Sequence, residues 1–150
     1  MSKDKTRRRM WLLSNTAHSL TMRYALIPLR LMVGIIFLTH GLQKAFGWFG
    51  GPGFSGTTDM LANMGFAVPG LFAVLLILAE AVGGIMLILA LAPRLAAAAL
   101  IVVMAVALAT AHKDESFFQT HVQQMVIAAC VTMFFAGGGD LGLQRSRPRD

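Results

Sequence analysis

The run PGLFAVLLILAEAVGGIMLILALA, residues 69–92, decides the fold class, because Glu80 is its one ionisable residue. A bilayer core about 30 Å thick is crossed by about 20 residues of α-helix. The run is long enough for this, and Pro69 stands at its start, where the missing N–H of a proline costs a helix nothing. The run therefore predicts a membrane-spanning helix.

Three more apolar segments bring the prediction to four spans. We place the spans at about residues 25–46, 69–92, 94–111 and 118–136. A glycine- and aromatic-rich connection, with a short helix from Thr58 to Met64, joins the first two spans. The chain is 56% hydrophobic and 13% charged, whereas soluble domains average about 25% charged residues. The predicted fold class is an all-α membrane protein, a bundle of four transmembrane helices.

The positions of lysine and arginine predict the orientation of this bundle. They cluster in an arm of residues 1–24, at Arg94 between the second and third spans, and in a tail of residues 145–150. Cytoplasmic loops carry an excess of these residues, so both termini are predicted in the cytoplasm, with residues 25–144 as the membrane domain. Topology thus explains the net charge of +6. Nucleic-acid binding is excluded, because no basic stripe alternates with aromatic residues on a polar scaffold.

Small residues that recur on one side of a helix, at four-residue spacing in the fourth span, predict the faces through which the last two spans pack. Such spacing lets helices approach closely in lipid, where no hydrophobic force drives them together. The residues are Ala98, Ala105 and Ala109 in the third span, and Ala128, Thr132 and Ala136 in the fourth.

Polar residues inside the first two spans are the candidate functional groups. Glu80 lies near the middle of the second span, and Arg30, Gly41 and Lys44 share one face of the first, with His40 at the edge of that face. An unpaired charge at a helix centre costs about 3 kcal/mol. Glu80 is therefore expected to be protonated, paired or both, and its depth suggests His40 or Arg30 as the partner.

Three histidines are predicted near the outer membrane boundary, namely His40, His112 and His121. Imidazole suits several transition metals, so the three are candidate metal ligands. Nothing in their spacing requires a metal, and a wetted position at the interface is the better explanation of His112 and His121. No metal site is predicted.

A longer pattern connects these residues to a known family. The pattern comprises Arg30, His40-Gly41-x-x-Lys44-x-Phe46-Gly47-x-Phe49-Gly50-Gly51-x-Gly53, Gly56, Glu80-x-x-Gly83-Gly84 and Arg94. It resembles the DoxX family of small bacterial four-helix membrane proteins. The resemblance implies an inner-membrane location and a link to oxidoreductases: founding members are similar to subunits of thiosulfate:quinone oxidoreductase, and relatives associate with soluble thiol and superoxide-handling enzymes. The chain departs from the family at Gln123 and Gln124, where many members carry an acidic residue.

The leading functional hypothesis is a membrane subunit of a redox system that binds a quinone or a similar small molecule in a polar intramembrane pocket. Glu80 and His40 would handle protons. The ligand-binding candidates are Arg30, Lys44, Gly41, Gly83 and Gly84. The chain has no flavin fingerprint and a single cysteine, Cys130, so electrons would come from a soluble or membrane oxidoreductase, and any enzymatic activity would belong to that assembly.

Two alternatives belong to other functional classes. The chain could be a non-catalytic scaffold that anchors soluble oxidoreductases, with its intramembrane charges forming a structural ion-pair network. It could also be a carrier of protons or small solutes that uses Glu80 as its mid-membrane site. The carrier hypothesis calls for a homo-oligomer, because four spans without an internal repeat provide little room for a transport path.

Overall fold

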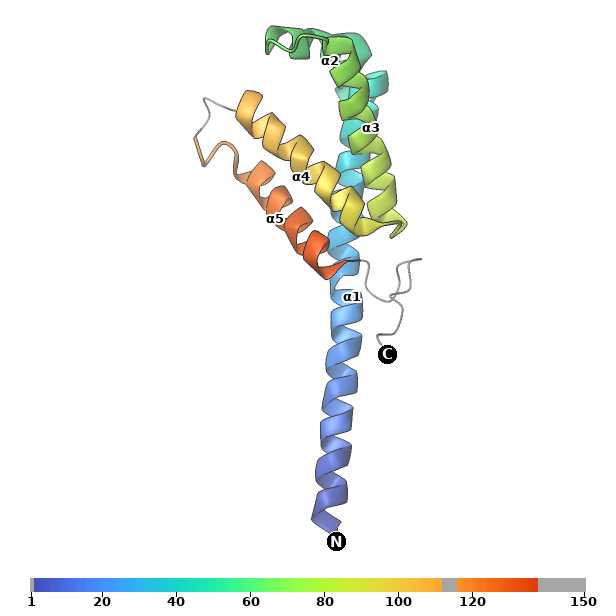
Figure 1. The fold of residues 1–150 in the computed structure, drawn as a ribbon. Coiled ribbons are helices and arrows are strands. Elements are labelled where there is room, and N and C mark those ends of the chain that lie inside the picture. The colour runs from blue at the N-terminus through green and yellow to red at the C-terminus, as the bar shows by residue number, and fades with distance from the viewer. Residues whose placement is uncertain (1, 112–115, 138–150) are drawn as a thin grey trace.

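The computed structural model describes the backbone of residues 2–111 and 116–137, and the side chains of residues 24–111 and 116–137. Every regular element in these ranges is a helix, which confirms the all-α prediction (Figure 1). In chain order the elements are α1 Ser2–Phe46, the 3₁₀ turn η1 Trp48–Gly50, α2 Gly53–Asn63, α3 Pro69–Ile88, α4 Pro93–Thr110 and α5 His121–Ala136. His112 and the predicted tail of residues 145–150 lie outside the described residues.

In the described part of the chain, three helices are long and apolar enough to cross a membrane. They are Tyr24–Phe46 within α1, the whole of α3 and the whole of α4. The apolar helix α5 has 16 residues, or about 24 Å of helix against a bilayer core of about 30 Å. The chain is thus a membrane protein with several apolar helices, and a fourth span and the cytoplasmic position of both termini stay predictions.

Several helix boundaries differ from the expected ones. α1 is continuous from Ser2 to Phe46, so no break separates the basic arm from the first span. α3 ends at Ile88 rather than near residue 92, because Ala90 and Ala92 have φ angles of 57° and 40°, which a right-handed helix does not accommodate. α2 is longer than the predicted helix and begins at Gly53.

Glycines bring α1 and α3 into close antiparallel contact. A Cβ atom on Gly84 would lie 2.7 Å from both the Gly34 carbonyl oxygen and the Leu38 amide nitrogen, and one on Gly41 would lie 2.8 Å from the Ala81 amide nitrogen. Both contacts are between backbones, which cannot give way as a flexible side chain does. Small residues at the crossing are the usual means of close approach between membrane helices.

The second pair of helices, α4 and α5, lies side by side and tilts away from α1 and α3 (Figure 1). The core between the two pairs consists of Val33, Phe37, Leu87, Ala96, Ala97, Leu100, Cys130 and Met133. The prediction of the packing faces was wrong: five of the six predicted residues are exposed, and Ala98 is half-buried. α4 and α5 instead bury the faces that carry Ala96, Ala97 and Leu100 in α4 and Cys130 and Met133 in α5, which join Leu87 and Phe37 in the core.

Candidate functional site

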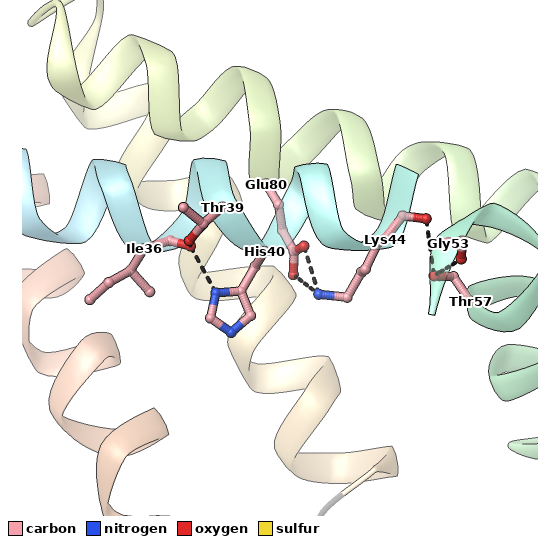
Figure 2. Close-up of polar contacts among 7 residues, drawn as sticks. All are labelled: Ile36, Thr39, His40, Lys44, Gly53, Thr57 and Glu80. Carbon is pink, nitrogen blue, oxygen red and sulfur yellow. Dashed lines mark hydrogen bonds and ion pairs between the residues drawn. The ribbon is translucent and has the colours of Figure 1, made fainter. Parts of the chain in front are cut away.

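An ion pair links the first two apolar helices near the α2 end of the bundle. The Lys44 Nζ atom donates hydrogen bonds to the Glu80 Oε1 atom at 2.8 Å and to the Oε2 atom at 2.7 Å (Figure 2). The Glu80 side chain is 2% exposed and that of Lys44 is 17% exposed. Both carboxylate oxygens are therefore satisfied by one cation, which offsets the cost of placing a carboxylate among apolar helices.

The ion-pair partner of Glu80 is Lys44, and not His40 or Arg30, the two that the sequence suggested. Arg30 lies 14 residues before Lys44 on the same helix, which corresponds to about 21 Å along the axis, so its side chain cannot reach the same carboxylate. The Arg30 side chain is buried elsewhere along α1, at 9% exposure. Lys44 reaches Glu80 from the last turn of α1 because Gly41, one turn earlier, holds the two backbones together.

His40 lies one turn before Lys44 and faces the same region. Its Nδ1 atom is 2.8 Å from the carbonyl oxygen of Ile36, one turn further back (Figure 2). A carbonyl oxygen only accepts hydrogen bonds, so Nδ1 carries the hydrogen and donates it. This bond fixes the orientation of the imidazole ring. His40 is otherwise exposed.

His40, Lys44 and Glu80 line one pocket between the two helix pairs. The pocket has a volume of about 260 Å³. Apart from Gln123, its other lining residues are apolar: Ile36 and Phe37 from α1, Met60 from α2, Leu76 from α3, Val103, Met104 and Ala107 from α4, Ala111, and Val122 and Val126 from α5. An apolar cavity with a few convergent polar groups is the usual form of a small-molecule site.

The helix α2 covers this pocket at one end, and sequence reasoning did not find its role. Met60 of α2 is in the pocket lining. Thr57, which is fully buried, donates to the Gly53 carbonyl oxygen at 2.7 Å and lies 3.3 Å from the carbonyl oxygen of Lys44 (Figure 2). The second contact ties α2 to the residue that pairs with Glu80. No signal in the sequence links Thr57 to Lys44, because the two are brought together by the direction of the chain between α1 and α2.

The three glycines predicted near a ligand lie at helix contacts and outside the pocket lining. Gly41 packs on Ala81, Gly84 packs on the backbone of α1, and a Cβ atom on Gly83 would lie 3.1 Å from the side chain of Leu100 in α4. These glycines position the helices that carry the polar groups. Their part in ligand binding is therefore indirect.

The candidate histidine set is not assembled in the described part of the chain. His121 is exposed, its Nδ1 atom hydrogen-bonds to the Phe118 carbonyl oxygen, and it is not part of the pocket lining with His40. In residues 24–111 and 116–137, no group of three His, Cys, Asp or Glu side chains is arranged to hold a metal ion. His112 lies outside these ranges.

Comparison with known proteins decides the family. The model of the DoxX family matches residues 25–113, which is more than half of the 150-residue chain. The chain belongs to the DoxX family. The matched region of this DoxX protein contains the ion pair, His40 and the α2 cover, and it ends before α5. No curated protein and no solved structure matches the chain.

Proposed function

We propose that this DoxX protein is a membrane subunit of a redox system and binds a quinone-type ring in the pocket between its helix pairs. One observation carries the proposal: His40, Lys44 and Glu80 come together on the wall of a pocket that is otherwise almost entirely apolar. A quinone has the matching chemistry, because its ring is apolar and its oxygens are polar. A lipid-soluble ligand also suits a protein whose helices face the bilayer.

The size of the pocket suits a single substituted ring. A dry apolar cavity of about 150 Å³ is sufficient to bind benzene, and the pocket here has about 260 Å³. The ring would lie among Phe37, Val103 and Met104, with one oxygen directed to His40 and Lys44. An alkyl tail would extend from the pocket into the lipid.

The polar wall supplies the proton chemistry that a quinone needs. Reduction of a quinone consumes protons, and histidine is the side chain whose ordinary titration range lies nearest to neutral pH. Glu80 would hold Lys44 in place and balance its charge. The electrons would come from a partner oxidoreductase, because the sequence contains no flavin fingerprint and a single cysteine.

The proposal places the protein in the inner membrane of a bacterium, with four spans and both termini in the cytoplasm. The exposed apolar side chains along α1, α3 and α4 support the bilayer environment; examples are Met32, Leu75 and Val102. The orientation rests on the lysine and arginine residues of the arm, of Arg94 and of the tail.

Purification from the native membrane tests the ligand. The tagged protein is extracted in a mild detergent, and the small molecules and proteins that accompany it are identified by mass spectrometry. Ala107→Phe fills the pocket, whereas Ala105→Phe on the same helix is the matched control, because Ala105 is exposed and outside the pocket lining. We expect a quinone with the wild type and the control, and at least tenfold less with Ala107→Phe. Equal recovery from all three would contradict the proposal.

A second candidate function is a scaffold for soluble oxidoreductases. The observation that favours it is the complete pairing of Glu80, whose two oxygens both accept from Lys44, as expected of a structural tie between helices. The same purification separates the two functions. A scaffold would retain its partner enzyme with the pocket filled by Ala107→Phe and would carry no quinone in any variant.

A further inference from the structure

The hydrogen-bonding state of His40 restricts the chemical form of the ligand. Because Nδ1 donates to the Ile36 carbonyl oxygen, the neutral ring has its lone pair on Nε2, which can then only accept a hydrogen bond. No hydrogen bond to Nε2 comes from the described residues. The Nε2 side of the ring points away from the helix that carries His40 (Figure 2), and His40 is part of the pocket lining. The pocket wall therefore presents an acceptor at this position.

Lys44 presents a donor on the same wall. Its ammonium group has three hydrogens, and two of them go to the oxygens of Glu80. One hydrogen is left for a ligand. His40 and Lys44 are four residues apart and so share one face of α1. A ligand in this pocket thus has an acceptor on His40 and a donor on Lys44 available to it.

A hydroxyl group is the oxygen that satisfies both neighbours. It donates to the His40 Nε2 atom and accepts from the Lys44 Nζ atom. A quinone carbonyl accepts a hydrogen bond from Lys44 but has no hydrogen to donate to His40. Its lone pairs and the lone pair of the His40 Nε2 atom would therefore repel each other. Leaving a desolvated polar group without its partner is the mechanism by which binding sites discriminate most strongly between close analogues.

We propose that His40 makes this pocket selective for a ring hydroxyl, so that it binds a hydroquinone or another phenol more tightly than the corresponding quinone. The inference rests on the proposed function, since it assumes that a ring occupies the pocket. A site that binds the reduced form tenfold more tightly raises the two-electron potential of the bound couple by about 30 mV. The pocket would therefore favour accepting electrons from the partner and holding the hydroquinone.

A redox-inert pair of probes tests the selectivity without a partner enzyme. The probes are 4-butylphenol and its methyl ether, which has the same ring and lacks the hydroxyl hydrogen. Their binding to the purified protein in lipid nanodiscs is measured by titration calorimetry, with Ala107→Phe as the blank for partition into lipid. We expect the wild type to bind the phenol about tenfold more tightly than the ether, which corresponds to about 1.4 kcal/mol.

Variants of His40 decide whether this residue is responsible. His40→Phe keeps a ring of similar size and removes the acceptor, so the preference for the phenol should fall to within about twofold. His40→Gln keeps an acceptor oxygen and should restore part of the preference. A preference that survives in His40→Phe, or a wild type that binds both probes equally, would overturn the inference.

The same measurements separate this inference from the proposed function. If neither probe binds above the Ala107→Phe blank, the pocket takes no ring, and both proposals fail. If both bind with equal affinity, the pocket takes a ring but His40 does not select its form.

A final titration, under anaerobic conditions, compares the binding of a short-chain hydroquinone with that of its quinone. Tighter binding of the hydroquinone supports the inference for a redox couple, and tighter binding of the quinone overturns it.

Discussion

The two helix pairs of this DoxX protein are held together in different ways. Between α1 and α3, glycines bring the backbones into contact, and Lys44 and Glu80 form an ion pair across the same seam. The buried residues of α4 and α5 include Leu100, Cys130 and Met133, while most of the small residues predicted to form their packing faces are exposed. Both contacts form, but the small-residue pattern did not identify the buried faces of α4 and α5, whereas glycines and a polar pair lie at the contact between α1 and α3.

The physical reason lies in the alternatives open to each residue. A carboxylate in the bilayer has few ways to avoid its desolvation cost, so the position of Glu80 strongly restricts which cation must lie beside it. An alanine that faces lipid loses little, because lipid tails are as apolar as a neighbouring helix. The desolvation cost of Glu80 therefore restricts how α1 and α3 pack. No comparable cost restricts how α4 and α5 pack, because their small apolar residues can face either lipid or a neighbouring helix.

The largest expected effect comes from breaking the ion pair. Lys44→Met leaves the Glu80 carboxylate buried without its cation, and we expect the free energy of unfolding to fall by about 3–5 kcal/mol. The double variant Lys44→Met/Glu80→Leu removes both charges and should recover most of the loss. Thermal unfolding in detergent is followed by maleimide labelling of Cys130, which is buried in α5.

This measurement also tests how far the two helix pairs depend on each other. Cys130 is not in the α1–α3 seam, so earlier labelling in Lys44→Met would show that the pairs open as one unit. If Lys44→Met is as stable as the wild type, the ion pair contributes nothing to the seam, and the comparison above is wrong.

A medium effect is expected from the glycine contact. Gly84→Ala places a Cβ atom 2.7 Å from the backbone of α1, and such overpacking typically costs about 1–3 kcal/mol. Gly70→Ala in the same helix is the matched control, because a Cβ atom there meets nothing within 4 Å. The control should gain up to about 1 kcal/mol from helix propensity. Equal stabilities of the two variants, measured as above, would mean that the backbones separate easily.

The smallest effect is expected on the exposed face of α4. Ala105→Leu should change the free energy of unfolding by less than about 0.5 kcal/mol, whereas Ala97→Leu, at a fully buried position of the same helix, should cost about 1–3 kcal/mol. A large loss for Ala105→Leu, with a change of mass on size exclusion, would instead identify this face as the contact in a homo-oligomer.

Sequence reasoning found the polar residues but did not find how they are joined. Glu80 and His40 were predicted from their position in apolar segments, and both line the pocket. The choice of Lys44 over Arg30 could not be predicted, because it depends on the register that Gly41 and Ala81 set between α1 and α3. Met60 and Thr57 were missed, since α2 is brought over the pocket by a turn whose direction the sequence does not show.

The sequence by itself determined that this chain is helical and belongs in a membrane, because length and apolar content decide whether a segment crosses a bilayer. It also determined that Glu80 needs compensation, since the cost of a buried charge is local. The tertiary structure alone decided which cation pairs with Glu80, which faces of α4 and α5 are buried, and that a pocket lies between the helix pairs. These features depend on how helices distant in the chain pack together, and many packings satisfy the same apolar pattern.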